Sequence, residues 1–443
     1  MNLDARVQSL HDQGVHTVLA QFVDIHGVAK GKWVPLGRLR DWVEVGAGFA
    51  GPSIWGTGLP RHGPRSEYHG RVQPESLQAL PFMPGFAHAV CDGYAGGEPL
   101  STCSRQLLKT QRARLDERGW TLSVGIEPEF FLLSRSPQGG WQPADSLDRL
   151  EKPSYDLKSL NRQAAFLGAF RQALAALGFD WEQIDHEDAC GQFEVNYRHD
   201  EALAAADRYV LFKMVAHTLA EREGLVFSCM PKPYPDMPGS GLHFHISLAD
   251  ADGRAVFSDP ADPARLSADG QAFVAGLLDH GDALSALCAP TVNSYRRLAL
   301  ARSRSGTTWA PVWKAHGENN RTCLVRTLPG RIEWRLPDPS CNVYAAMAAT
   351  LAAGLDGMDR GLNAGPGCVD DLYERAAAGG QPMPPRLPRD LAAALDALEG
   401  DRALRAQLGP DFCEQFLAIK WREWDAYAGS VSDWELERYA AAF

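Results

Sequence analysis

The segment GLHFHISL, residues 241–248, decides the fold, because its side chains alternate strictly between apolar and polar. A period of two places successive side chains on opposite faces of a β-strand. One face would carry Leu242, Phe244, Ile246 and Leu248. The other would carry His243, His245 and Ser247. The segment therefore predicts a strand that buries one face and presents imidazole and hydroxyl groups on the other.

Three further segments alternate in the same way: TLSVGIEPEFFLL (121–133), GQFEVNY (191–197) and RIEWRLP (331–337). Their polar faces carry Glu127, Glu129, Gln192, Glu194, Asn196, Arg331, Glu333 and Arg335. The polar face of any single amphipathic strand is usually just solvated. Four faces that supply glutamate, histidine and arginine, rather than lysine, threonine and serine, favour one functional site on one sheet.

The acidic residues of these strands indicate a metal site. Glu187, in the turn HEDACGQFE (186–194), brings the set to five carboxylates and a histidine. Like charges at this density repel each other unless cations lie between them. Oxygen ligands with one imidazole suit Mg²⁺ or Mn²⁺ rather than zinc. Two such ions beside phosphate oxygens are the usual arrangement for phosphoryl transfer.

A second group of residues is cationic: Arg297 in NSYRRL (293–298), Arg321 and Arg326 in NNRTCLVR (319–326), Arg331 and Arg335. Guanidinium groups bind carboxylates and phosphates with two parallel hydrogen bonds. The same arginines could instead form structural ion pairs with the nearby acids. The loop KPYPDMPGSG (232–241) could bring backbone N–H groups toward an anion, although a glycine-rich loop alone is weak evidence.

The composition excludes several classes of protein. The chain has 443 residues, 45% of them hydrophobic, and a net charge of −11 with no long basic run, which argues against nucleic acid or an anionic membrane as a partner. Nine scattered cysteines without a CxxC pair predict reduced thiols. The charged start MNLDARVQSLHDQG is unlike a signal peptide, and no apolar run approaches the roughly 20 residues of a membrane span. We expect a cytoplasmic protein.

The remaining patterns predict an α+β chain with a boundary near residue 100. Before it we expect a helix at 3–13, extended segments at 16–27, 28–36 and 87–94, and an ordered glycine-rich loop at 46–65. After it we expect helices at 100–119, 157–178 and 201–223, and a helical region from about 384 onward. The two domains would be residues 1–100 and 101–443.

Taken in order, these segments resemble the glutamine synthetase family over nearly the whole chain. The motifs are EPEF (127–130), EDACGQFE (187–194), PKP…GSGLHFHISL (231–248), NSYRRL, NNR…R and RIEWRLPDPS (331–340). The resemblance implies a small N-terminal β-grasp domain and a larger catalytic domain, whose antiparallel sheet carries the metal and nucleotide site between flanking helices. It also implies a homo-oligomer, commonly a dodecamer, with active sites between neighbouring subunits.

The resemblance also implies roles for individual residues. One metal ion would bind to Glu129, Glu187 and Glu194, and another to Glu127, His243 and Glu333. Glutamate would bind to Gly239, Arg297 and Arg335. Arg321 would stabilise the transferring phosphoryl group, with Arg297 and Arg335 as further catalytic groups. The nucleotide would contact His245, Ser247, Arg326 and Arg331. In the family reaction, ATP phosphorylates the glutamate γ-carboxylate, and an amine then attacks γ-glutamyl phosphate.

Two departures from the family pattern bear on the amine. A typical flap segment resembles YEAP, but here it reads SGTTWAP (305–311), with Trp309 at the position of the acid. A typical N-terminal loop resembles FDGSS, but here it reads FAGPS (49–53), with Ala50 at the position of the aspartate. Both anionic groups of the usual ammonium site are replaced, which leaves a roomier and more apolar pocket. The pattern is similar to the branch that contains γ-glutamylmethylamide synthetases and type III glutamate–ammonia ligases.

We therefore expect a ligase that uses methylamine, with ammonia as the alternative acceptor. A catalytically silent sensor of an amine or glutamate is a further alternative, although it would not need a full set of metal ligands. A polyamine or aromatic-amine ligase is a third possibility, but the loops supply no acidic surround for a polycation. Trp33 and Trp55 could also line the amine pocket or lie in a core or subunit boundary. Tyr373 stands where some relatives carry a nucleotidylated tyrosine, but we expect a packing or surface role.

Overall fold

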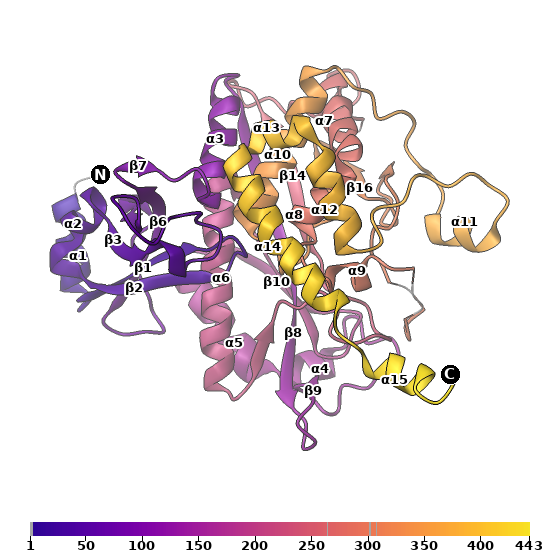
Figure 1. Ribbon diagram of the computed structural model, residues 1–443, viewed down its shortest axis with the longest axis horizontal. Helices are drawn as coiled ribbons and strands as arrows, with labels where there is room; N and C mark the ends of the chain where they lie inside the picture. The colour runs from indigo at the N-terminus through magenta and orange to yellow at the C-terminus, as the bar shows by residue number, and fades with distance from the viewer. Residues whose placement is uncertain (1–2, 264, 301–302, 307) are drawn as a thin grey trace.

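The computed structural model describes residues 3–263, 265–300, 303–306 and 308–443, which form two β-sheets with helices packed around them (Figure 1). The helices are α1 (Leu3–Asp12), α2 (Leu39–Glu44), α3 (Ser104–Asp116), α4 (Leu157–Arg162), α5 (Ala164–Ala176), α6 (Ala202–Arg222), α7 (Ala268–Asp279), α8 (Gly281–Cys288), α9 (Ser294–Arg297), α10 (Val343–Asp359), α11 (Leu372–Ala378), α12 (Leu391–Gly400), α13 (Arg402–Leu408), α14 (Pro410–Ala428) and α15 (Asp433–Tyr439). Among the helices of the described residues, none has both the length and the apolar character of a membrane span.

The first sheet has the strand order β2-β1-β6-β4-β3. Its strands are β1 (Thr17–Val23), β2 (Ala29–Pro35), β3 (Ala47–Ala50), β4 (Glu67–Val72) and β6 (Phe86–Ala95), with β5 (Gln78–Ala79) and β7 (Glu98–Pro99) paired to β6. The hairpin of β1 and β2 is antiparallel, whereas β1 runs parallel to β6. This mixed sheet is the expected β-grasp fold. It packs on its own apolar cluster, which runs from Leu10 to Cys103.

The second sheet has the order β10-β11-β8-β14-β17-β16-β15. Its strands are β8 (Thr121–Arg135), β10 (Trp181–His186), β11 (Gln192–Tyr197), β14 (Leu242–Ala249), β15 (His316–Glu318), β16 (Val325–Leu328) and β17 (Arg331–Trp334), and β9 (Trp141–Pro143), β12 (Asp200–Glu201) and β13 (Val226–Ser228) pair with β8. All four strands predicted from alternation are present and are hydrogen-bonded neighbours in this sheet.

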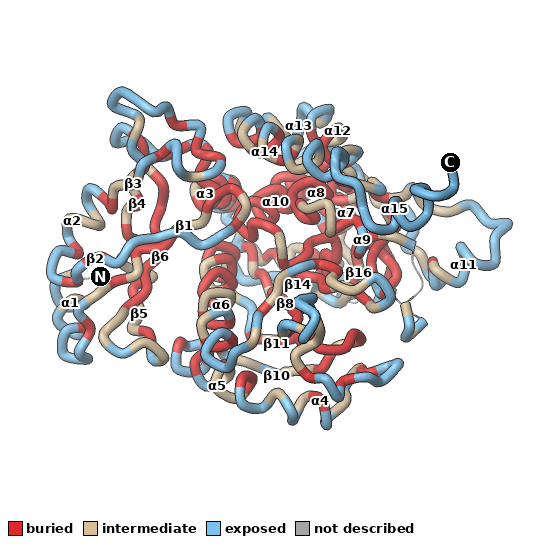
Figure 2. The backbone as a smooth tube through the Cα atoms, turned by 60° about the horizontal axis from the view of Figure 1, so that its bottom comes forward, coloured by how far each residue is buried: buried red, intermediate tan, exposed pale blue. Residues whose placement is uncertain are grey.

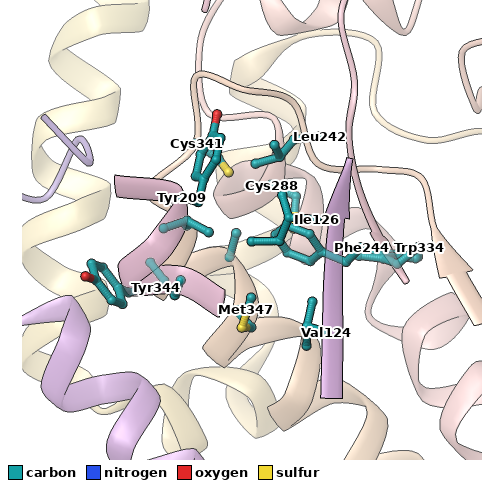
Figure 3. Close-up of a cluster of buried hydrophobic side chains, with 14 of the residues drawn as sticks. Val124, Ile126, Tyr209, Leu242, Phe244, Cys288, Trp334, Cys341, Tyr344 and Met347 are labelled. Carbon is teal, nitrogen blue, oxygen red and sulfur yellow. The ribbon is translucent and has the colours of Figure 1, made fainter. Parts of the chain in front are cut away.

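The apolar faces of these strands are buried against helices, as alternation predicts. Val124, Ile126, Phe244 and Trp334 lie in one cluster with Met347 of α10 and are each at most 1% exposed (Figure 3). Burial of one such side chain stabilises the fold by roughly 1.5–3 kcal/mol. In Figure 2 the buried residues gather where α6, α8 and α10 meet the sheet. Because helices occupy one face, the polar side chains must lie on the opposite face.

Two expectations need correction. The segment 46–65 is not a loop throughout, because β3 pairs with β4, a strand that was not predicted. The four residues of β3 are too few to show alternation. The helix expected at 157–178 is two helices, α4 and α5, which meet at Gln163 (φ −95°, ψ 13°) outside helical geometry. The alanine-rich helix α10 was also missed, because it is apolar all round and shows no periodic face.

Candidate active site

The strand register brings the predicted site residues together in opposed pairs. Glu194 of β11 lies opposite Glu129 of β8, and Glu127 of β8 lies opposite His243 of β14. On the next pair of strands, His245 lies opposite Glu333. Side chains of directly opposed residues approach to about 4.5–5.5 Å between their Cβ atoms. Acidic and imidazole groups from four different strands therefore converge on one face of the sheet.

These side chains line a cavity of about 670 Å³. Twelve predicted site residues are in its wall: Glu127, Glu129, Glu187, Glu194, Gly239, His243, Arg297, Trp309, Arg321, Arg326, Glu333 and Arg335. Four predicted site residues of the described chain are outside this wall: Ala50, His245, Ser247 and Arg331. Ala50 belongs to β3 of the first sheet, whereas Ser247 lies further along β14, opposite Ser123.

His243 and His245 both contact the acids of the cavity. His243 Nδ1 lies 3.5 Å from a carboxylate oxygen of Glu127 and 3.5 Å from one of Glu333. His245 Nε2 lies 2.8 Å from Glu127 Oε1. Ligand atoms of Glu127, His245 and Glu333 all lie within 4.8 Å of one another, close enough to hold a metal ion. The geometry thus brings His245, which the family pattern gives to the nucleotide, beside acids that are expected to bind metal.

On the β11 side of the cavity, burial raises the pKa of the acids. Burial and the charge of Glu187 raise the pKa of Glu129 to about 8. Burial, with the charges of Asp185 and Asp188, raises the pKa of Glu187 to about 7, and burial beside Glu187 raises that of Glu194 well above its usual value. Three carboxylates that resist ionisation side by side are a donor set for divalent cations, which would remove the repulsion.

At Glu127 of β8 and Glu333 of β17, hydrogen bonds and the charge of Arg335 outweigh the effect of burial. Burial would raise the pKa of Glu127, but hydrogen bonds from His243 and His245 lower it. The pKa of Glu333 is about 2, because the charge of Arg335 overcomes the effect of its burial. Burial and Arg335 lower the pKa of His243 to about 4, so its imidazole is neutral at pH 7 and can act as a metal ligand.

The arginines are held in three different ways. Arg326 and Arg335 both pair with Glu333, so the structural ion pairs considered above do exist. Arg297 is 4% exposed and donates from Nη1 to Leu336 O and from Nη2 to Arg335 O, each at 2.9 Å. Arg321 is exposed to solvent in the cavity wall. Fixed and exposed guanidinium groups thus share one cavity with the acids.

The 232–241 loop is hydrogen-bonded to one of the acids of the cavity. The backbone N–H of Gly241 donates to Glu129 Oε2 at 3.0 Å. A Cβ atom on Gly239 would lie 2.4 Å from Pro231 O and 3.2 Å from the Arg297 side chain. Only glycine therefore allows this loop to pass so close to Arg297.

Several contacts fix the flap, residues 305–311, of which Thr307 lies outside the described residues. Arg335 Nη2 donates to Trp309 O at 2.9 Å, and Thr308 Oγ1 donates to the Tyr373 hydroxyl at 2.9 Å. Tyr373 in turn donates to Ala310 O and packs on Trp313. The Tyr373 hydroxyl thus both accepts and donates a hydrogen bond inside the protein, in keeping with the expected packing role.

Residues with strained backbone conformations lie at or next to this cavity. In the described part of the chain, three non-glycine residues have a positive φ: Tyr155 (64°), Trp309 (55°) and Asn319 (47°). Tyr155 and Trp309 line the cavity, and Asn319 accepts hydrogen bonds from Arg326. Such conformations cost of order 1–3 kcal/mol each and persist where the surroundings enforce them, often at functional sites.

Sequence reasoning missed part of the cavity wall: Lys152, Ser154, Tyr155, Gln183, Asp185, Asp188, Gln192, Asn196, Pro238, Gly241, Thr308 and Ala310. Asp185 is on β10, opposite Glu194. Gln192 donates from Nε2 to Glu129 Oε2 at 3.0 Å. The one available signal was the polar face of 191–197, on which Gln192 and Asn196 flank Glu194. Gln183 lies with Asp185 on β10, and the others come from loops without periodicity.

Comparison with known proteins gives consistent results. The family model described as "Glutamine synthetase, catalytic domain" matches residues 101–439. A glutamate–methylamine ligase of Methyloversatilis universalis is 45% identical over 439 residues, 98% of each chain. A glutamine synthetase of Rhizobium leguminosarum bv. phaseoli is 36% identical over 426 residues, 96% of each chain. A solved structure described as a GmaS/ADP complex superposes with a TM-score of 0.91 at 36% identity, covering 98% of this chain and 99% of that chain. An apo GmaS structure gives a TM-score of 0.90 at 34% identity over the same shares.

Proposed function

The chain belongs to the glutamine synthetase family, and on that premise we propose that it is an ATP-dependent carbon–nitrogen ligase that joins the γ-carboxylate of glutamate to methylamine. The observation that carries the choice of amine is the place of Trp309, which lines the cavity from the flap where the family pattern has an acid. Without that carboxylate, the cavity loses charge for capturing ammonium and gains an apolar surface for a methyl group. The 45% identity to a glutamate–methylamine ligase supports the same substrate.

We propose that two or more Mg²⁺ or Mn²⁺ ions bind among the glutamates that line the cavity. Glu129, Glu187 and Glu194 would hold one ion, and Glu127, His243 and Glu333 another, with His245 close enough to share it. The raised pKa values on the β11 side and the neutral imidazole of His243 support this assignment. When bound, such ions neutralise the charge of the carboxylates and of the ATP phosphates.

Substrate positioning would be the work of the arginines and the 232–241 loop. We assign Arg297, Arg335 and Gly239 to glutamate, and Arg326, Arg331, His245 and Ser247 to the nucleotide. A γ-carboxylate oxygen attacks the terminal phosphorus of ATP, and the bond from that phosphorus to ADP breaks. Arg321, exposed in the cavity wall, would stabilise the charge on the transferring phosphoryl group. The amine then attacks the carbonyl carbon, phosphate leaves, and the nitrogen gives up a proton.

Ala50 does not border the cavity of its own chain, within the described residues. We propose that it reaches the amine pocket of a neighbouring subunit in a homo-oligomer, as a dodecamer with shared sites would allow. We further propose a domain boundary near residue 100, since the first sheet and its apolar cluster end there. The described cysteines are free thiols, which supports a reducing, cytoplasmic location.

Phosphate release tests the function directly. The enzyme is assayed with ATP, glutamate, Mg²⁺ and a panel of ammonia, methylamine and longer alkylamines. We expect kcat/KM to be highest for methylamine. A higher kcat/KM for ammonia would make the chain a glutamine synthetase instead, the function named for the relatives at about 36% identity.

A further inference from the structure

Asp188 connects two separate loops beside the cavity. Its side chain accepts a hydrogen bond from Ser154 Oγ at 2.8 Å through Oδ1 and one from Ser305 Oγ at 2.7 Å through Oδ2. Asp188 itself is only 4% exposed. Hydrogen bonds from hydroxyls to a carboxylate are short and strong, because the acceptor is ionised. One buried side chain therefore ties together residues that are 151 positions apart in the sequence.

The two tied loops carry the two strained aromatic residues of the cavity. Ser154 immediately precedes Tyr155, and Ser305 begins the flap that carries Trp309. Leu150 and Pro153 of one loop share a narrow cleft with Arg304 and Ser305, next to Asp188. The loops thus face each other around this carboxylate, while Tyr155 and Trp309 extend into the main cavity.

Each loop also has an anchor of its own. The backbone N–H of Tyr155 donates to His186 O at 2.8 Å, and the backbone N–H of Arg304 donates to Asp236 O at 2.8 Å. Arg335 holds the carbonyl of Trp309 at 2.9 Å. These bonds attach the loops to different parts of the fold, but none of them joins one loop to the other. Asp188 makes that connection.

We propose that Asp188 is a positioning residue that fixes the flap against the 152–155 loop and thereby sets the width of the amine pocket between Trp309 and Tyr155. This inference rests on the proposed function. Asp188 does not touch the amine; it acts through Ser305 and Ser154. Removing the carboxylate would remove both of these hydrogen bonds, so the flap would lose this connection to the opposite loop. Amine binding should suffer, whereas the binding of glutamate and ATP should not.

The first test measures structure without substrates. Hydrogen–deuterium exchange of the free enzyme is followed in peptides that cover 303–306 and 152–156. Asp188→Ala and Ser305→Ala should both raise exchange in the flap peptide, and Ser154→Ala should raise it only in 152–156. Asp188→Asn retains the shape and can still bond to both serines, so it should restore most of the protection. Unchanged flap exchange in Ser305→Ala would overturn the proposal, even if Asp188→Ala fails to fold.

The second test is kinetic. Ser305→Ala should raise KM for methylamine about fivefold, the net effect of losing one typical hydrogen bond, with KM for glutamate and ATP within about twofold. In the Asp188→Ala background, Ser305→Ala should add much less than it does alone, because both substitutions remove the same hydrogen bond. Additive effects, or equal losses for all three substrates, would overturn the positioning role. A wild type that prefers ammonia would instead refute the proposed function, while the exchange pattern would still test the connection between the loops.

Discussion

Glu129 of β8 and Glu194 of β11 lie directly opposite each other in an antiparallel pair, although both are buried acids. Opposed like charges destabilise a sheet. Burial and the nearby Glu187 raise the pKa of both carboxyl groups. A bound cation would remove this repulsion, and we therefore propose that the metal ions bind between these strands.

The first prediction concerns pH and metal ions. Because the folded pKa of Glu129 is raised to about 8 from an ordinary 4.5, the folded protein binds more protons than the unfolded chain between these values. Without divalent ions, stability should therefore fall as pH rises from about 4.5 to 8. Thermal unfolding in a chelator should show a lower Tm at pH 8 than at pH 6, and Mg²⁺ or Mn²⁺ should restore more stability at pH 8. Glu129→Gln should flatten the pH dependence, and a metal effect that is equal at both pH values would contradict this account.

A second prediction concerns the choice of amine. Trp309→Glu returns a carboxylate to the flap, which should attract ammonium and reduce the apolar surface for a methyl group. We expect the ratio of kcat/KM for ammonia to that for methylamine to rise at least about tenfold, because the variant loses one contact with the methyl group and gains one negative charge. Trp309→Phe retains an aromatic ring and should leave the ratio nearly unchanged. If both variants shift the ratio equally, charge at this position does not select the amine.

The third prediction concerns Gly239. Alanine here would place its Cβ atom 2.4 Å from Pro231 O and press on Arg297, so the loop and the guanidinium must move. KM for glutamate should rise by about tenfold or more, since a misplaced binding group can cost up to about a hundredfold. Gly168 of α5 is the matched control, because a Cβ atom there meets nothing within 4 Å. Gly168→Ala should retain full activity and add about 0.5–1 kcal/mol of stability. A normal glutamate KM in Gly239→Ala would remove the loop from substrate binding.

Much of the catalytic sheet was predictable from sequence, and the reason is physical. In 241–248 the apolar residues must be buried, so the period of two fixes which way His243 and His245 point. β10 could not be found this way, because WEQIDH has no alternating apolar face, and Asp185 was missed with it. Asp188 was missed because its partners are 34 and 117 residues away and no local pattern records such contacts. Ala50 could be noted from the motif FAGPS, but its place on β3 depends on a pairing with β4 that no short pattern shows.

The last prediction concerns a buried histidine outside the site. His280 Nδ1 lies 2.6 Å from Asp401 and Nε2 lies 3.0 Å from Asp356, and burial would lower its pKa, but the hydrogen bonds that its ring donates to these two acids raise it. A raised histidine pKa contributes stability that is fully present below pH 6.5, the ordinary value, and is lost as pH rises through the higher folded value. His280→Gln should cost about 3 kcal/mol at pH 6, because the partly buried Asp401 loses its cation and Asp356 retains only Arg360. The Tm difference from wild type should shrink toward pH 9, and the exposed His62→Gln should show no difference at either pH. A Tm difference that grows with pH would mean that His280 is neutral in the folded protein.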